Sequence, residues 1–336
     1  IWGPDGTQKS AAVLNTAEFG TVFTPSVLLD SRAAVYLYGR VPMTRANCAG
    51  TKDRGVLIER MATDGSVAVR HRYEPAENIS ISDVGVDKAG NVFLAGLALY
   101  ETGTSPCRTE YRYELVKFDA AGTRQWVFTE PWSGTVYLSS IVPDDAGGIF
   151  WLGTARACSG CYETCPADLR LLKVDATGTR ASGFGSGGIK TDDWGASEDY
   201  VSWATVDALG NVLVGGWSRT YAPASCFAPD TSVLKLARYS GATGARLTFT
   251  EVWDELANSG GTSLLGPDAA GNWGFLKVTA TPTGTEMVNI SYEISKYLPA
   301  GSLAWTATKD MRDTRYYQSA GGRMDAGGCS CYAMGG

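Results

Sequence analysis

The sequence predicts an all-β protein, a six-bladed β-propeller of four-stranded antiparallel blades. Three observations support this prediction. The 336 residues include 41 glycines, ten tryptophans and sixteen tyrosines, a composition typical of many short strands joined by tight turns. One turn phrase recurs at intervals of about 60 residues, as expected for a repeat architecture. A second strand–turn–strand phrase alternates with it, so that each repeat holds four strands, which we call A to D.

The first phrase is an Asp-x-x-Gly turn followed by a strand, and it is clearest in DALGNVLVGGW at 207–217. The aspartate side chain can accept bonds from nearby backbone N–H groups, and the glycine tolerates a positive φ. The phrase therefore predicts an A–B hairpin, and its aspartates are turn-formers, not catalytic groups. The other copies begin at Asp30, Asp87, Asp144, Asp268 and, with a methionine in place of the aspartate, Met324.

The second phrase reads YELVKFDAAGTRQWVF at 113–128, LRLLKVDATGTR at 169–180 and YEISKYLPAGSLAW at 292–305. Looser copies occupy 56–69 and 233–249. Each copy is a strand, a glycine turn and a second strand, which predicts a C–D hairpin. One A–B and one C–D hairpin together make one propeller blade.

The hairpin count predicts how the ring closes. Six A–B hairpins stand beside five internal C–D hairpins, and the missing one matches WGPDGTQKSAAVL at 2–14, with Gly6 at its turn. We therefore expect residues 1–15 to complete the blade formed by 318–336. Closure of this kind leaves no free sheet edge at the seam. It makes 1–336 a single domain.

The fourth repeat carries a resemblance to a known family. SEDYVSWATVDALGNVLVGGW at 197–217 and SVLKLARYSGATG at 232–244 are similar to the blade repeat of bacterial β-propeller repeat proteins. The resemblance covers the whole chain and implies an exported or cell-surface protein, but it says little about function. The sequence departs from the pattern at Ala33–Ala34, at Trp273–Gly274 and at Met324.

Composition excludes several function classes. The formal charge is −6 and there is no basic run, which argues against nucleic acid as a partner. No apolar run approaches the roughly 18 residues that a membrane-spanning helix needs. No glycine-rich phosphate loop follows a strand and opens a helix. We expect no cofactor.

Eight cysteines predict disulfides more strongly than a metal site, because only one Cys-x-x-Cys pair is present. Six of them fall in B–C loops on one face, whereas the last two lie in strand B of the sixth repeat. Buried thiols, links elsewhere or a C-terminal sorting signal are alternatives for that last pair. The prediction places the protein outside the cell or at its surface, with the periplasm as an alternative. The cysteines are Cys48, Cys107, Cys158, Cys161, Cys165, Cys226, Cys329 and Cys331.

Little in the sequence indicates catalysis. His71 is the only histidine, which excludes His–His metal sites, and it is expected in a solvated loop between two arginines. Calcium at Asp192, Asp193 and Asp199 is considered, but no twelve-residue loop with alternating oxygens exists. No catalytic or metal-binding residue is therefore assigned.

Acidic and aromatic residues of the D–A loops are the candidate ligand-binding groups. Flat rings offer apolar surfaces to a glycan or peptide, and charged side chains supply directed hydrogen bonds. The alternative is that these aromatics pack between blades. The candidates are Trp132, Trp194, Trp253 and Tyr316 for the rings, and Asp193, Asp254 and Arg315 for the polar contacts.

These observations favour a disulfide-stabilised, non-catalytic binding or structural module that uses its loop-rich face for protein or glycan interaction. Two alternatives stay open. One is a surface assembly or filament subunit that packs against itself. The other is an extracellular carbohydrate-active enzyme with carboxylates in a central funnel.

Overall fold

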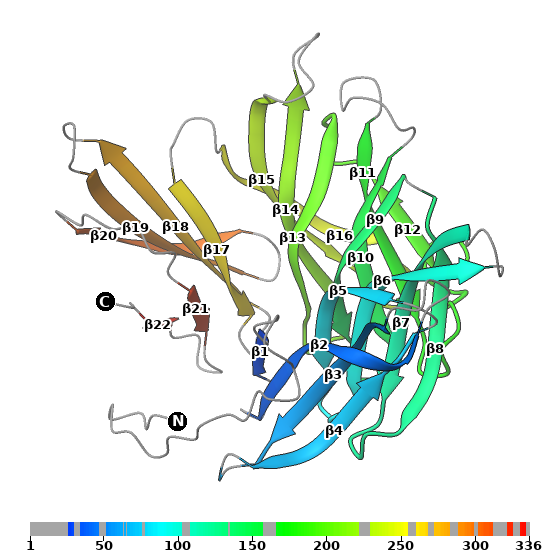
Figure 1. Ribbon diagram of the computed structural model, residues 1–336. Coiled ribbons are helices and arrows are strands. Elements are labelled where there is room, and N and C mark those ends of the chain that lie inside the picture. The colour runs from blue at the N-terminus through cyan, green and yellow to red at the C-terminus, as the bar shows by residue number, and fades with distance from the viewer. Residues whose placement is uncertain are drawn as a thin grey trace. The chain divides into compact units, whose positions relative to one another are not determined.

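The structure, a computed structural model, is built from β-strands and turns, and its described residues contain no helix (Figure 1). The all-β prediction is confirmed for this part of the chain. The residues described are 26–29, 34–46, 52–62, 64, 66–75, 78–102, 108–133, 135–156, 166–221, 229–254, 260–267, 272–282, 288–298, 302–311, 321–324 and 330–333.

The strands follow the order that the two phrases predict, an A–B hairpin and then a C–D hairpin in each of five repeats. The first two repeats give β1 (Ser26–Leu29), β2 (Val35–Ala46), β3 (Lys52–Met61), β4 (Val67–Tyr73), β5 (Asn78–Val86), β6 (Val92–Thr102), β7 (Arg108–Phe118) and β8 (Arg124–Pro131). The third and fourth give β9 (Val136–Pro143), β10 (Ile149–Arg156), β11 (Ala167–Val174), β12 (Ile189–Asp192), β13 (Glu198–Val206), β14 (Val212–Tyr221), β15 (Pro229–Tyr239) and β16 (Arg246–Asp254). The remaining strands are β17 (Gly260–Pro267), β18 (Trp273–Pro282), β19 (Val288–Tyr297), β20 (Leu303–Met311), β21 (Gly321–Met324) and β22 (Ser330–Ala333).

Three repeats each form a separate four-stranded sheet in chain order: β1-β2-β3-β4, β5-β6-β7-β8 and β17-β18-β19-β20. The third and fourth repeats are joined in one eight-stranded sheet through the parallel pair Ala167↔Glu198 of β11 and β13. Strands β21 and β22 form a two-stranded sheet. Residues 1–15, predicted to complete this last sheet, lie outside the described part of the chain, so the ring closure stays a prediction.

The chain divides into two compact units. The first comprises Ile1–Ser133, Leu138–Ile149 and Val174–Arg180, and the second comprises Gly134–Tyr137, Phe150–Lys173 and Ala181–Gly336. Each has its own apolar core. In the first, Tyr36, Ile58 and Phe118 belong to one buried cluster. In the second, Leu213, Trp217 and Trp273 do so.

The predicted role of the repeated aspartates is confirmed where the structure describes them. The Asp87 carboxylate accepts a bond from the Asn91 backbone N–H at 2.8 Å, and Gly90 takes a φ of 89°. Asp144 accepts from the Gly148 N–H at 2.7 Å, and Asp207 accepts from the Asn211 N–H at 2.9 Å. All three aspartates are buried. They satisfy the turn's own N–H groups and are not available to a ligand.

The structure contradicts the predicted environment of His71. The predicted solvated loop is strand β4, in which Arg70 and Arg72 are exposed while His71, only 1% exposed, and Tyr73 are buried. Side chains alternate between the two faces of a strand, so the flanking arginines indicated an inward histidine. Its ring lies edge-on to Phe118 with 5.5 Å between centroids. Burial, first, and the Arg60 charge lower the pKa of His71 to about 4.

Candidate functional site

An exposed pair of aromatic rings lies at one end of the β5–β8 sheet. Tyr111 is near the start of β7, and Trp132 directly follows β8. The Trp132 backbone N–H donates to the Tyr111 carbonyl at 3.4 Å, which holds the two residues opposite each other. Their ring centroids are 5.2 Å apart at 60°, yet the residues remain 42% and 38% exposed. Two rings fixed in this way present an apolar surface to solvent.

The other face of β7 anchors this end of the sheet. Glu114 is buried and accepts hydrogen bonds from the Tyr73 hydroxyl, at 2.6 Å, and from the Tyr100 hydroxyl. Burial raises the pKa of Glu114. Arg112 lies over the Tyr100 ring, 5.0 Å from its centroid. Because side chains alternate along the strand, these contacts on one face leave Tyr111 on the opposite face.

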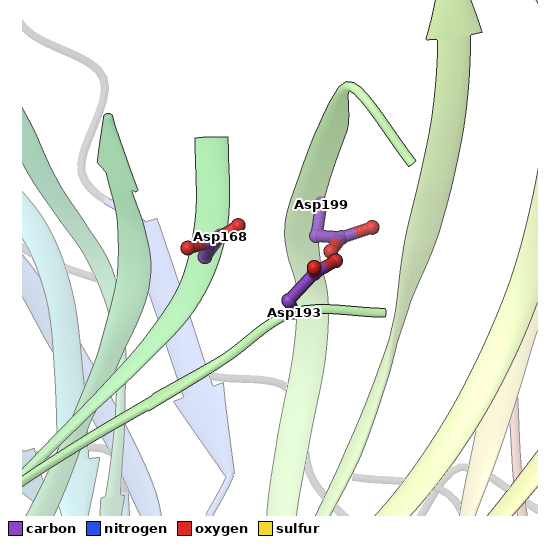
Figure 2. A group of neighbouring side chains, drawn as sticks. All are labelled: Asp168, Asp193 and Asp199. Atoms are coloured by element: carbon purple, nitrogen blue, oxygen red, sulfur yellow. The ribbon is translucent and has the colours of Figure 1, made fainter. Parts of the chain in front are cut away.

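Three carboxylates meet in the second unit. Asp168 lies in β11, Asp193 follows β12, and Asp199 lies in β13. One oxygen from each lies within 4.8 Å of the others, and Figure 2 shows the three side chains as sticks. Asp193 is exposed, whereas Asp199 is 0% exposed. Carboxylate oxygens are the ligands that hard cations such as calcium prefer.

Burial and two hydrogen bonds determine the pKa of Asp199. The Ser218 hydroxyl donates to one of its oxygens and the Trp194 backbone N–H to the other, each at 2.6 Å. Burial raises its pKa to about 6, against these two bonds, and Asp193 adds to the rise. The pKa of Asp168 is raised by burial and by the charges of Asp193 and Asp192. Since both oxygens of Asp199 already accept bonds inside the protein, the cluster by itself does not define a metal site.

Asp192, considered with Asp193 and Asp199 as a calcium ligand, takes part in other contacts. Its carboxylate accepts from the Tyr239 hydroxyl at 2.7 Å and from Arg246 at 3.0 Å. Asp192 and Asp193 are adjacent in sequence but have separate hydrogen-bond partners, because the Asp193 carboxylate accepts from the Gly195 N–H at 2.6 Å.

Trp194 corrects another expectation. The sequence predicts that its flat ring is open to a ligand, but the residue is 3% exposed and its indole N–H donates to the Tyr239 hydroxyl at 2.9 Å. Its ring lies 5.9 Å from that of Phe249. For Trp194, the alternative of an aromatic packed in the interior therefore holds. Asp193 is exposed.

The other predicted site residues are only partly described. Trp253 and Asp254 lie in β16, opposite Leu234 and Val233, and their side chains are outside the described part. Cys331 lies in β22 opposite Arg323. The remaining predicted residues lie outside the described part of the chain: Arg315, Tyr316, Cys48, Cys107, Cys158, Cys161, Cys165, Cys226 and Cys329.

Sequence reasoning missed Tyr111 and Asp168. Tyr111 belongs to the C strand, whereas the aromatic residues predicted to bind a ligand all belong to D–A loops. The signal was the alternation of Tyr111 and Tyr113 before the apolar run of β7. Asp168 carries no comparable signal, since only the adjacency of β11 and β13 brings it to Asp199.

The described chain contains no helix with the length and apolarity needed to cross a bilayer. No protein-family model matches the sequence, and no curated protein matches it.

Several solved structures align with most of this chain at low sequence identity. A polysaccharide lyase (an ulvan lyase) aligns with 10% identity over 90% of this chain and 72% of its own, with a TM-score of 0.45. A mannose phosphorylase from Leishmania mexicana aligns with 11% identity over 86% and 82%, at 0.36. An apocarotenoid oxygenase from Synechocystis aligns with 9% identity over 93% and 64%, at 0.43. At these scores and identities the likenesses assign no activity to the chain.

Proposed function

We propose that this chain is an exported, disulfide-stabilised six-bladed propeller of the bacterial repeat type that binds a glycan without catalysis. The observation that carries the binding role is the Tyr111–Trp132 pair, exposed and fixed at the end of the β5–β8 sheet. The apolar faces of sugar rings pack on aromatic rings, which lose little conformational entropy when they bind. The proposal of a six-bladed propeller is supported by the alternation of the two phrases along the sequence.

The rigidity of this surface favours a binding role for the two rings over exposure by chance. The backbone bond from Trp132 to Tyr111 and the buried Glu114 contacts hold the strand before a ligand arrives. Preorganisation of this kind lowers the entropy cost of binding.

The acidic cluster does not favour the enzyme alternative. Its one fully buried member, Asp199, has a raised pKa, as general acids often have. A general acid must nevertheless reach the atom it protonates. Asp199 is enclosed and bonded on both oxygens. Its raised pKa therefore follows from burial within the fold and needs no catalytic explanation.

Binding to a panel of immobilised neutral and acidic polysaccharides tests the proposal. Trp132→Ala and Tyr111→Ala should each weaken binding at least about tenfold, equivalent to roughly 1.4 kcal/mol, with melting temperatures near that of the parent. Leu209→Ala is the matched control, because Leu209 is an exposed apolar side chain on the β13–β14 turn. Retention of full affinity by Trp132→Ala, or binding to no member of the panel, would contradict the proposal.

A further inference from the structure

The exposed Tyr111–Trp132 pair has a carboxylate beside it on the same face of the sheet. The ladder between β7 and β8 places Tyr113 opposite Glu130. The bond from the Trp132 N–H to the Tyr111 carbonyl continues this ladder. Residues two apart on a strand extend from the same face, with roughly 7 Å between their Cα atoms. Glu130 therefore lies next to Trp132 on the face that carries the two rings.

Glu130 is buried and holds an exposed arginine. Its side chain is 8% exposed, and its Oε2 accepts a hydrogen bond from Nη2 of Arg180. The Arg180 side chain is 41% exposed. Among the described residues, Glu130 is the one acceptor that the guanidinium contacts. The N–H groups on Nε and Nη1 of Arg180 therefore remain available to a ligand.

The turn that carries Arg180 is fixed along strand β8. Segment Val174–Arg180 belongs to the same compact unit as β7 and β8. The Trp126 indole N–H donates to the Ala176 carbonyl at 3.0 Å. Gly178, at a φ of +84°, packs so closely that a Cβ there would lie 2.7 Å from Cγ of Trp126. Trp126 and Glu130 are four residues apart and share a face of β8, so these contacts position Arg180 before a ligand arrives.

A guanidinium beside two aromatic rings favours one class of sugar. The guanidinium donates hydrogen bonds and accepts none, and its planar fork matches a carboxylate in a bidentate contact. The apolar face of a sugar ring packs on an aromatic ring. A uronic acid offers both features, because its carboxylate is attached to such a ring. A neutral sugar offers the guanidinium only hydroxyl oxygens, which form weaker bonds than a charged acceptor does.

We propose that Arg180 determines specificity for a polyuronate, with a uronate ring packed on Tyr111 and Trp132 and its carboxylate bound by the guanidinium. This inference rests on the proposed glycan-binding function and adds the class of glycan. Glu130 is a positioning residue, because its buried carboxylate fixes one arm of the guanidinium. The formal charge of −6 opposes nonspecific attraction of a polyanion, so this binding depends on local contacts.

Binding to immobilised polygalacturonate and to its fully methyl-esterified form tests the inference, at about 0.15 M salt to screen distant charges. The two polymers have the same sugar rings, but only the first carries carboxylates. The protein should bind polygalacturonate at least about tenfold more tightly. Equal affinity for the two forms overturns the inference and leaves glycan binding intact. Binding only to neutral polysaccharides does the same, whereas binding to no polysaccharide also contradicts the proposed function.

Substitution assigns the charge contact to Arg180. Arg180→Gln should lower the affinity for polygalacturonate about tenfold and leave that for the ester unchanged. Trp132→Ala should weaken binding to both polymers, because both use the ring contact. Arg70→Gln is the matched control, since Arg70 is 52% exposed and donates to the buried Glu59 at 2.8 Å in the β1–β4 sheet. Equal losses on the two polymers for Arg180→Gln, or an equal effect of Arg70→Gln, overturns the inference.

Two further measurements separate recognition from folding and identify the anion. Arg180→Gln leaves the buried Glu130 carboxylate without its cation, which destabilises a fold. Should its melting temperature fall, the double variant Glu130→Gln/Arg180→Gln, which removes both charges, takes its place in the same comparison. Dextran sulfate replaces the carboxylate with a sulfate. Tighter Arg180-dependent binding to dextran sulfate than to polygalacturonate overturns the assignment to a uronate, and weaker binding supports it.

Discussion

The buried carboxyl of Asp199 makes the stability of this protein depend on pH in a predictable direction. Its pKa rises from the ordinary 3.8 to about 6 in the folded chain. Well below pH 3.8 the carboxyl is protonated in both the folded and the unfolded chain, and it costs no stability. As the pH rises toward 6 only the unfolded chain ionises, so stability falls, and above 6 the loss is complete. At 1.36 kcal/mol for each pKa unit the loss is about 3 kcal/mol.

Asp199→Asn removes this titration while keeping the hydrogen bonds. The amide oxygen can accept from the Trp194 N–H, and the amide N–H₂ can donate to the Ser218 oxygen, in place of the two bonds that the carboxylate accepts. The difference in unfolding free energy, variant minus parent, should therefore rise by roughly 2.5 kcal/mol between pH 4 and pH 7, because part of the total change already lies below pH 4. Urea denaturation at several pH values, followed by circular dichroism, measures this difference.

Two further variants test the cause of the shift. Asp193→Asn removes a neighbouring charge that raises the pKa of Asp199, so the midpoint of the pH dependence should move down. Ser218→Ala removes a hydrogen bond that lowers it, so the midpoint should move up. A variant-minus-parent difference that stays flat between pH 4 and pH 7 would refute the reasoning, because it would mean that the Asp199 carboxyl is not desolvated.

Two other predictions concern stability. The parent should lose stability as the pH falls from 6.5 to about 4, because the unfolded histidine takes up a proton in this range while the folded one does not. His71→Phe should remove about 3 kcal/mol of this loss, as measured by urea unfolding at several pH values. Parallel pH curves for parent and variant would count against this prediction. Gly178→Ala should destabilise the fold by roughly 2–4 kcal/mol, the sum of a positive-φ penalty and a clash with Trp126. Thermal melting measures that loss, with the unconstrained Gly183→Ala as its control; equal melting temperatures for the two variants would show that the Gly178 contact is not formed.

Much of the fold could be predicted because its signals are local. A turn aspartate and a positive-φ glycine act within five residues, so Asp87 with Gly90 and Asp144 with Gly147 could be assigned from the printed letters. Each hairpin then follows from the apolar or β-branched runs on either side. The order of strands within the separate sheets is the consequence of such hairpins in sequence.

The candidate site was less predictable because aromatic residues look alike in sequence. Trp132 and Trp194 both stand in acidic D–A segments, yet one is exposed and the other is buried beneath Tyr239 and Phe249. The partner that gives Trp132 its role, Tyr111, is 21 residues away in the chain. No local pattern distinguishes these outcomes, because they depend on which side chains the neighbouring strands supply.

The sequence by itself determined the repeat, the hairpins and the turn roles of the aspartates, since these depend on backbone conformation over a few residues. Only the tertiary structure decided that His71 is buried, that Asp168 joins Asp193 and Asp199, and that Tyr111 meets Trp132. Burial and the pKa changes that follow from it are set by contacts between strands far apart in the chain. Those contacts arise only when the sheets assemble and exclude water.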